Sequence, residues 1–481
     1  MKSMREPYHC KLREFWHCQI GYISPKVYAH RIGGSQDLIE RLQLYGKLKG
    51  HAGCVNTVHF NPSGEILVSG SDDRRIVFWD WAAKISRLSY CSGHDSNVFQ
   101  AKVMPFSGDR SVVSCAADGQ VRHAQIKEDG TVETKKLAKH QGRAHKLAIE
   151  PGSPRHFYSC GEDGVVRHFD LRSNKSTKLF SCLSSGAGSN QWRRKRAVVR
   201  LNAIAINSRN PHYFAVGGSD EFARVYDIRK SYVNVSGTGD HPVDTFTPSH
   251  LIGSDQVHIT CVAYSLQEEL LASYNDEHIY LFEKGMGSGS DAKSAVVTEG
   301  VNASREGPQV YKGHRNAQTV KGVNFFGPNT EYVVSGSDCG RIFIWKKTGG
   351  QLVSLMMGDE QVVNCLEPHP YATVLATSGI DKDVKIWAPT AENRLPLPPD
   401  AEKVMEMNKN NREERTPFAI IPDVMMHLLR VQRLHARRRG RLSEDGMIVD
   451  GEHDDGGGGI RIDDGESESS SDDGSQECII S

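Results

Sequence analysis

The chain has 481 residues with 59 basic and 59 acidic side chains, so its formal net charge at neutral pH is zero. This balance gives no reason to expect direct binding to nucleic acid. The N-terminus has no signal-peptide pattern, and no run reaches the roughly 18 apolar residues of a membrane span. We therefore expect a soluble intracellular protein that makes at most weak contact with membranes.

Seven segments of the sequence repeat one plan. Each has an apolar, β-branched run, a turn of small residues and aspartate, and a second run that ends in an aromatic residue or its equivalent. They lie at 66–80, 112–124, 157–172, 214–229, 270–282, 333–345 and 375–387. Such a plan predicts a β-hairpin, and a further short strand on each side gives four strands per unit. The repeats predict an all-β fold over 44–390, a seven-bladed β-propeller.

Most of these turns carry an aspartate, and a histidine precedes several repeats. The aspartates are Asp73, Asp118, Asp163, Asp220, Asp276 and Asp381, and the histidines are His51, His94, His140 and His314. The sixth repeat has Cys339 at the aspartate position. The repeats resemble the WD-repeat family, which implies that such a histidine bonds the turn aspartate and that a serine and a tryptophan complete the network. Because buried polar groups need partners, we assign these residues a structural role.

Neither a catalytic site nor a metal site is indicated. The sequence has no phosphate-binding loop, nucleophile elbow or HExxH pattern. His9-Cys10 and His17-Cys18 supply metal-ligand residue types, but their spacing matches no common zinc module. Four cysteines lie in or beside apolar runs and are expected to be buried free thiols: Cys115, Cys160, Cys261 and Cys365. We expect a protein that is not an enzyme and binds no metal or cofactor.

The N-terminal segment, 1–43, is expected to contain a short amphipathic helix. In the stretch 35–45, Ser35 is the N-cap, and the apolar face consists of Leu38, Ile39, Leu42 and Tyr45. That face fits two roles equally well, packing under the propeller or binding a partner. The following segment, Leu44 to Lys49, is placed to supply the outer strand of the last blade and so to close the ring.

Long inserts interrupt the repeats at 182–199, 231–256 and 284–310. We expect all three to follow an outer strand and precede an inner one, which puts them on one face of the propeller, where they form a candidate ligand surface. Arg193, Arg194, Lys195 and Arg196 make this surface locally basic. The cluster fits a ligand surface, a solvated charge cluster or a nuclear localisation signal.

Two neighbouring repeats end in an aromatic-Asp-x-Arg box. One box contains Asp170 and Arg172, and the other contains Asp227 and Arg229. An arginine fork binds carboxylates and carbonyl groups, and a neighbouring aspartate can orient it. A single box would be explained by an Asp–Arg pair that tightens a turn within its blade. Two adjacent boxes favour docking of a partner protein.

Several segments between about Leu44 and Thr390 resemble one family more specifically, the WD-repeat substrate receptors of cullin-4 RING ubiquitin ligases, and most closely its group of cullin-4-associated factor eight. They include GCVNTVHFN (53–61), LASYNDEHIYLF (271–282), YKGHRNAQTVKGVNFFGP (311–328) and VVNCLEPHP (362–370). The resemblance implies that Asp170, Arg172, Asp227 and Arg229 contact the adaptor protein that bridges to cullin-4. Trp79-Asp80-Trp81-Ala82 lacks the arginine, which puts adaptor contact at blade one in doubt, and Cys339 does the same for the network of blade six.

This resemblance implies a function without chemistry of its own. The propeller would hold an unknown protein substrate and the adaptor, while ubiquitin transfer occurs elsewhere in the complex. The alternative is a chromatin-binding or peptide-binding WD-repeat scaffold unrelated to ubiquitin. The two differ in whether the arginine boxes bind the adaptor.

The C-terminal part departs from the repeat pattern. We expect a linker at 391–421, a basic amphipathic helix at 422–441 and an acidic disordered tail at 442–481. The helix carries Arg437, Arg438, Arg439 and Arg441, which fit nuclear import, a partner helix or a membrane-surface helix, and we favour the first. The tail ends in Cys478-Ile479-Ile480-Ser481, which matches the prenylation pattern and predicts modification by farnesyltransferase. We expect the protein in both nucleus and cytoplasm.

Overall fold

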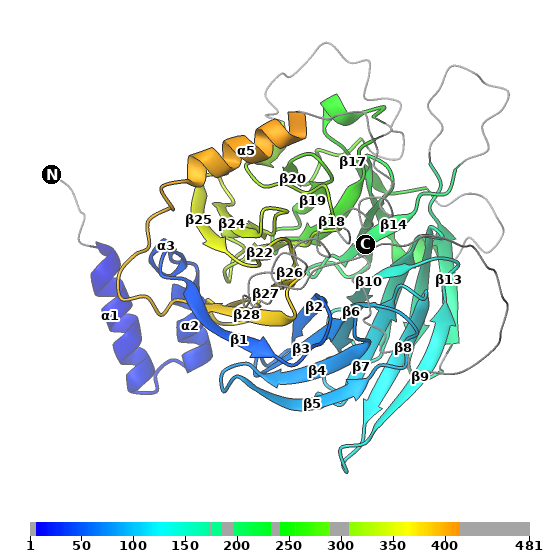
Figure 1. The fold of residues 1–481 in the computed structure, drawn as a ribbon, viewed down its shortest axis with the longest axis horizontal. Coiled ribbons are helices and arrows are strands. Elements are labelled where there is room, and N and C mark those ends of the chain that lie inside the picture. The colour runs from blue at the N-terminus through cyan, green and yellow to red at the C-terminus, as the bar shows by residue number, and fades with distance from the viewer. Residues whose placement is uncertain are drawn as a thin grey trace, which may run out of the picture. The chain divides into compact units, whose positions relative to one another are not determined.

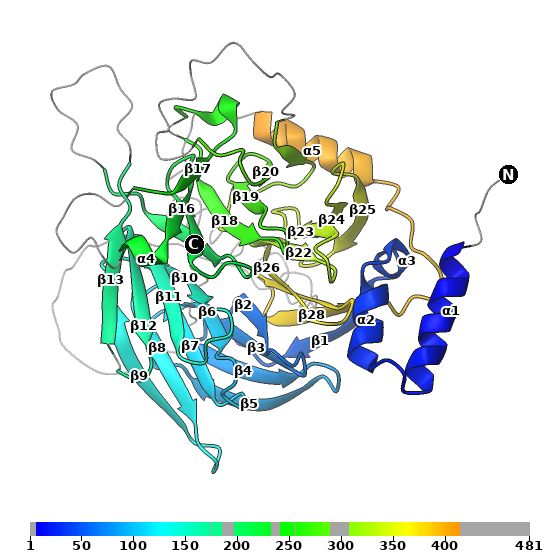
Figure 2. The ribbon, with the colours of Figure 1, turned by 180° about the vertical axis from the view of Figure 1, so that it is seen from behind.

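The computed structural model describes residues 6–173, 175–184, 197–231, 241–254, 256–288 and 307–413. Within these residues the chain forms seven four-stranded antiparallel sheets, which Figures 1 and 2 show arranged around a central axis. The innermost strand of each sheet contacts the innermost strands of both neighbours, so the ring is closed. The predicted seven-bladed β-propeller is confirmed.

The strands of each blade are called a to d from the inside outwards. Blade one is β2 (Val55–Phe60), β3 (Ile66–Ser71), β4 (Arg75–Asp80) and β5 (Ile85–Cys91). Blade two is β6 (Val98–Val103), β7 (Ser111–Ala116), β8 (Gln120–Ile126) and β9 (Val132–Lys139). Blade three is β10 (Ala144–Ile149), β11 (His156–Gly161), β12 (Val165–Asp170) and β13 (Lys175–Ser181). Blade four is β14 (Leu201–Ile206), β15 (Tyr213–Gly218), β16 (Ala223–Asp227) and β17 (Asp244–Phe246), with α4 (Ile228–Ser231) after β16.

Blade five is β18 (Ile259–Tyr264), β19 (Leu270–Tyr274), β20 (Ile279–Phe282) and β21 (Gln309–Tyr311), preceded by η1 (Ser249–Leu251). Blade six is β22 (Val323–Phe326), β23 (Tyr332–Ser335), β24 (Arg341–Lys346) and β25 (Leu352–Met357). Blade seven is β26 (Val363–Pro368), β27 (Leu375–Gly379), β28 (Asp383–Ala388) and, as its outer strand, β1 (Gln43–Lys49). Because the strands alternate in direction, the a-to-b and c-to-d connections emerge on one face, called the ab/cd face. The b-to-c turns and the links between blades emerge on the other, the bc/da face.

The core is divided among the interfaces between neighbouring blades. In the described part of the chain, seven clusters of buried side chains each join two adjacent blades. For example, Tyr158 and Val166 of blade three pack with Phe214 and Tyr226 of blade four. Each sheet thus buries both faces, which explains the nearly continuous apolar runs of the inner strands.

The N-terminal strand closes the ring. β1 pairs antiparallel with β28 from Gln43 opposite Ala388 to Lys49 opposite Asp383. This confirms the prediction that the segment from Leu44 to Lys49 supplies the outer strand of the last blade. The closure joins the two ends of the propeller and removes the open sheet edges that an incomplete ring would expose.

The helix expected over 35–45 is shorter than predicted. Helix α3 (Gln36–Ile39) does begin at the Ser35 cap, whose Oγ accepts from the Leu38 N–H at 3.4 Å, but the chain then enters β1. Beyond Ile39 the prediction is wrong because the backbone from Gln43 onward is hydrogen-bonded to β28. Ile39 and Leu42 are buried with side chains of blades six and seven, which favours the packing role of this segment.

Helices outside the ring account for the rest of the described chain. Helices α1 (Glu6–Gln19) and α2 (Pro25–Gly33) form a hairpin joined by an ion pair between Arg31 and Glu14, 2.9 Å. Helix α5 (Ala401–Glu413) lies within the segment predicted as a linker, so that prediction is wrong there. Its Ala401 is buried against blades five and six, and Asn408 donates to the carbonyl oxygen of Gly313 at 2.8 Å. No described helix has the length and apolarity to span a membrane.

The placement of the inserts also differs from the prediction. Because β17 and β21 are d strands, the chain leaves β16 and β20 and enters β17 and β21 on the ab/cd face, so the insert at 284–310 and the first part of that at 231–256 connect strand c to strand d. The part of the insert from 247 to 256 leads from β17 to blade five, as predicted. The segment 182–200 does link two blades, as expected. The three-residue d strands inside the inserts are too short to show an alternating pattern, so the sequence did not reveal them.

Some predictions fall outside the described residues: Arg193 to Arg196, the basic helix at 422–441, the acidic tail and Cys478, together with the side chains of His9 and Cys10. The four cysteines predicted as free thiols are free. Cys115 and Cys160 are buried, whereas Cys261 and Cys365 are partly exposed.

Candidate partner-docking site

In the first three blades a histidine links the turn aspartate to a buried serine. His51 contacts Asp73 through Nδ1 at 2.9 Å and Ser69 through Nε2 at 2.7 Å, and Trp79 donates its indole N–H to the same serine oxygen at 2.7 Å. The equivalent contacts join His94 to Asp118 and Ser114, and His140 to Asp163 and Ser159. All three histidine side chains are fully buried. These groups tie each bc turn to the preceding link on the bc/da face.

The turn aspartates of these blades are held as carboxylates. Burial alone would raise the pKa of Asp163, but the bonds from His140 and from the backbone N–H groups of Gln141 and Val165 outweigh it, so its pKa is lowered. The pKa values of Asp73 and Asp118 are lowered for the same reasons. A histidine bonded to both an aspartate and a serine has the residue types of a catalytic triad. Here the hydroxyl is completely buried, so this arrangement serves the fold.

Elsewhere a buried cation replaces the histidine. In blade four Arg224 forms an ion pair with Asp220 at 2.5 Å, and in blade seven Lys385 contacts Asp359, Asp381 and Asp383 at 2.8, 2.7 and 2.6 Å. Burial by itself lowers the pKa of Lys385, but the bonds to the three carboxylates outweigh this effect and raise it. Sequence reasoning found Asp220 and Asp381 but missed their partners.

Blade six has neither arrangement. His314 is fully buried, and neither of its ring nitrogens has a hydrogen-bond partner among the described residues. With Cys339 at the usual aspartate position, the preceding Asp338 instead forms a buried ion pair with Lys321. In blade five, the Asp276 backbone N–H donates to the Asn316 carbonyl oxygen at 2.7 Å. The structure therefore does not bring His314 to a turn aspartate.

The two arginine boxes lie at the ends of adjacent c strands, on the ab/cd face. Asp170 accepts from the Arg172 backbone N–H at 3.0 Å and from its guanidinium at 3.0 and 2.9 Å. Asp227 accepts from Arg229 in the same way, at 2.9 Å from the backbone and at 3.1 and 2.9 Å from the guanidinium. The arginine side chains remain 57% and 60% exposed. Each aspartate thus holds the guanidinium group of its arginine in one orientation, and the exposed N–H groups of that guanidinium can still donate to a partner.

The charge state of the boxes is fixed by the same contacts. Hydrogen bonds from Arg172 lower the pKa of Asp170 to about 2, and those from Arg229 lower the pKa of Asp227. Both pairs therefore stay charged across the physiological range. Within each blade the pair also tightens the c-to-d turn, so this role and docking are compatible.

Blade one has a variant of the box. Asp80 is the last residue of β4, and its partner is Arg87 from the neighbouring strand β5, at 2.5 Å, in place of an arginine two residues on. Asp80 and Arg87 also line a pocket of about 530 Å³ with Trp81, His369 and the start of α2. Sequence reasoning missed this arginine because it lies seven positions after the aspartate. Only the pairing of β4 with β5 brings the two side chains together.

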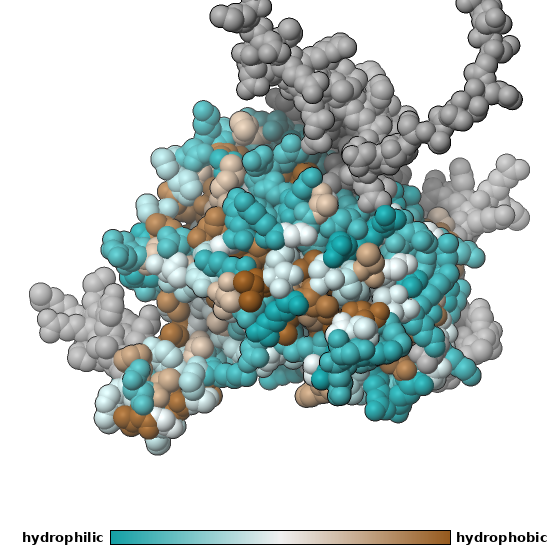
Figure 3. Space-filling view, turned by 60° about the horizontal axis from the view of Figure 1, so that its bottom comes forward, coloured by the Kyte–Doolittle hydropathy of each residue, from teal (hydrophilic) through white to brown (hydrophobic). Residues whose placement is uncertain are grey.

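The α1–α2 hairpin adds an apolar surface that the sequence analysis did not identify. Phe15, Trp16, Ile20 and Tyr22 are 47%, 59%, 55% and 76% exposed. Figure 3 shows apolar side chains gathered on the lobe at its lower left, where the hairpin lies. The hairpin is anchored on the ab/cd face, since Thr373 donates to the carbonyl oxygen of Gly33 at 3.0 Å. Clustered exposed aromatics are typical of protein-binding surfaces.

The closed ring of seven four-stranded sheets defines the class of this protein as a seven-bladed β-propeller. The family WD domain, G-beta repeat matches residues 42–80, 307–346 and 350–388. The chain is 32% identical to DDB1- and CUL4-associated factor 6 of Homo sapiens over 296 residues, covering 60% of this chain and 34% of that protein. It is 36% identical to Protein ALTERED SEED GERMINATION 2 of Arabidopsis thaliana over 276 residues, covering 52% and 36%.

A third similarity extends over more of the chain. WD and tetratricopeptide repeats protein 1 of Homo sapiens is 24% identical over 590 aligned positions, which cover 74% of this chain and 86% of that protein. By contrast, the chain spans about a third of the length of the first two relatives.

Proposed function

We propose that this protein is a non-catalytic substrate receptor of a cullin-4 RING ubiquitin ligase and that it docks the adaptor DDB1 through the boxes of Arg172 and Arg229. The observation that carries the proposal is the pair of exposed guanidinium groups, each fixed by an aspartate, on adjacent blades of one face. Similarity to a relative named as DDB1- and CUL4-associated supports the choice of partner.

The ab/cd face offers more than the two boxes. The α1–α2 hairpin is anchored on the same face, and its exposed aromatic side chains can add apolar contact area to the polar contacts of the arginines. The bc/da face is then left for a protein substrate. Holding both raises the effective concentration of a substrate lysine near the ubiquitin-conjugating enzyme.

The test replaces both box arginines with alanine in the full chain. We expect the affinity for purified DDB1 to fall at least about tenfold, because buried interfacial arginines commonly contribute 2 kcal/mol or more. The matched control is Arg75→Ala, an exposed arginine at the opposite end of the blade one c strand, bonded to Ser89. Unchanged DDB1 binding by the Arg172→Ala, Arg229→Ala variant would contradict the proposal and favour the chromatin-binding or peptide-binding scaffold.

Three finer assignments are part of the proposal. Within the receptors we place the chain nearest the group of cullin-4-associated factor eight, on the segments at 53–61, 271–282 and 311–328. We propose that it occurs in nucleus and cytoplasm, on the basis of its arginine clusters. We also propose farnesylation of Cys478, which a mass measurement of wild type against Cys478→Ser would show.

A further inference from the structure

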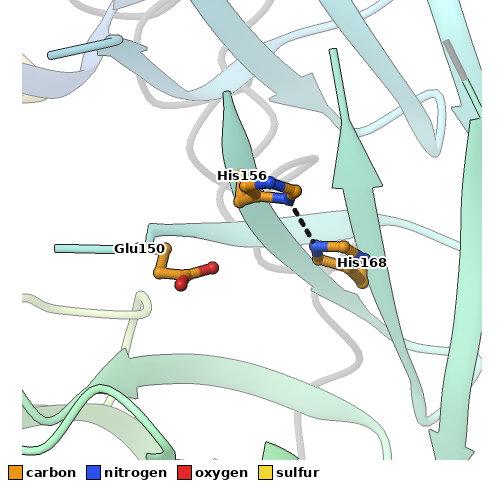
Figure 4. Close-up of side chains that lie close together, drawn as sticks. All are labelled: Glu150, His156 and His168. Carbon is orange, nitrogen blue, oxygen red and sulfur yellow. Dashed lines mark hydrogen bonds between the residues drawn. The ribbon is translucent and has the colours of Figure 1, made fainter. Parts of the chain in front are cut away.

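A hairpin of blade three brings two histidines and a glutamate together. His156 begins β11, His168 lies on the paired strand β12, and Glu150 directly follows β10. His156 Nδ1 and His168 Nε2 are 3.1 Å apart, and one oxygen of Glu150 lies within 4.8 Å of both. Figure 4 shows the three side chains around one space, with the hydrogen bond between the rings drawn as a dashed line. All three are partly exposed, so an ion can reach them.

Two imidazoles and one carboxylate form a ligand set that suits zinc and similar transition metals rather than magnesium or calcium. Ligand atoms about 2.1 Å from a tetrahedral zinc ion lie about 3.4 Å apart. The two ring nitrogens of His156 and His168 already meet this spacing within a few tenths of an ångström. The Glu150 carboxylate needs a rotation about its side-chain bonds to reach the same point.

The surroundings of the cluster fit a metal ion. The buried Tyr158 donates its hydroxyl to Glu150 Oε2 at 3.3 Å and so orients the carboxylate, as groups around metal ligands commonly do. Arg172 is the nearest cation, with Nη2 3.4 Å from His156 Nε2, but the carboxylate of Asp170 balances its charge. On metal binding the His156 ring proton moves from Nδ1 to Nε2, and the exposed guanidinium gives up this long contact.

The equivalent hairpin of blade two provides an internal comparison. There the sequence DGQVRH repeats DGVVRH of blade three, so His123 takes the position of His168. The other two positions hold Met104 and Ser111, and His123 bonds the Ser111 hydroxyl at 2.8 Å. Blade two therefore shows the same strands with one histidine and no second or third ligand.

From this geometry we propose that Glu150, His156 and His168 form a zinc-binding site on blade three. The site is open, with three protein ligands and room for water at a fourth position. Its ligands are not the box residues, although Arg172 contacts His156, and zinc binding can be measured without the adaptor, so its test does not depend on the proposed function. It also departs from the sequence analysis, which assigned no metal: twelve residues separate the two histidines, and only strand pairing brings them together.

The experiment titrates zinc chloride into the chelator-treated full chain in competition with a chromophoric chelator. We expect the wild type to bind one zinc ion more than the His156→Ala, His168→Ala variant, and His123→Ala to bind as many as the wild type. Other thiols and imidazoles in the chain contribute equally to all three proteins. Magnesium chloride in excess should not displace the ion. Equal zinc stoichiometry and affinity in wild type and double variant would overturn the proposal.

Two milder variants keep the test decisive if the double variant does not fold. Glu150→Gln keeps the size of the side chain and its bond from Tyr158 but loses the charged ligand. Tyr158→Phe removes only the orienting hydroxyl. We expect each to weaken zinc binding about tenfold or more, and a zinc-dependent rise in the melting temperature of the wild type should be reduced in both. Zinc affinities equal to the wild type in both variants would show that the three side chains bind no metal.

Discussion

Blades one to three and blade seven anchor the same turn by different chemistry. In the first three a buried imidazole links the turn aspartate to a serine hydroxyl, whereas in blade seven one buried ammonium group, Lys385, contacts three carboxylates. The aspartate recurs while its partner changes. The difference shows that in these four blades the turn carboxylate can be paired with either a histidine or a lysine.

The histidine-based turns and the lysine-based turn of blade seven differ in how strongly their stability depends on the histidine or on Lys385. Removing His140 takes one bond each from Asp163 and Ser159, and Asp163 keeps its backbone donors. Removing Lys385 leaves three acids together, one of which, Asp359, has a side chain with no exposed surface. Unpaired buried charges cost more than unpaired neutral groups. The cation-based blade should therefore be the more sensitive of the two.

The largest predicted effect is that of Lys385→Ala. We expect it to reduce the free energy of unfolding by about 3–5 kcal/mol, because it breaks a buried ion pair and leaves the carboxylates to repel one another. Urea unfolding followed by tryptophan fluorescence measures the change. Lys47→Ala is the control, since Lys47 also contacts Asp383, at 3.9 Å, but is 44% exposed and should cost less than about 1 kcal/mol. Equal effects of the two variants would show that the buried ion pairs of Lys385 stabilise the fold no more than an exposed one.

The next prediction concerns pH and blade three. The pKa of Asp163 is lowered in the folded chain, so its contacts stabilise the fold fully at pH values above the unfolded pKa of about 3.9. That contribution is lost as the pH falls through the folded pKa. At pH 7, Asp163→Asn should therefore be less stable than the wild type by about 1.5–3 kcal/mol. The gap should stay constant down to about pH 4 and narrow below it, as unfolding midpoints over this range can show. A gap independent of pH would mean that the charge of Asp163 does not matter.

The sequence revealed the residues whose spacing is local or repeated. The seven hairpins, the closing strand β1 and the pairs of His51, His94 and His140 all follow from a pattern that recurs along the chain. The cation partners follow a weaker signal: Arg224 and Lys385 each lie four residues after a turn aspartate. Arg122 occupies the same position in blade two, yet there it bonds Gln120 and Thr134 because His94 already holds the aspartate. The spacing alone therefore does not identify the partner.

Features that depend on the pairing of strands could not be predicted from the sequence. The short d strands β17 and β21 make c-to-d connections of the insert at 284–310 and of the first part of that at 231–256, and nothing in three residues marks a strand. The contact of Arg87 with Asp80, and that of His156 with His168, arise from register between strands. The residues of both arginine boxes could be predicted because each aspartate and its arginine are two positions apart.

The smallest predicted effect is the sharpest test of the comparison. His140→Leu should reduce the free energy of unfolding by about 1–3 kcal/mol, because it leaves Ser159 and Asp163 without their shared partner. His314→Leu should change the free energy of unfolding by less than about 1 kcal/mol, because neither ring nitrogen of His314 has a hydrogen-bond partner among the described residues. The variant loses the edge contact of the imidazole with Trp345, but leucine supplies apolar contact in its place. The two variants measured together by urea unfolding separate a bonded histidine from a merely buried one. A loss at His314 as large as that at His140 would show that a buried histidine without hydrogen bonds at its ring nitrogens is as necessary as those of the first three blades.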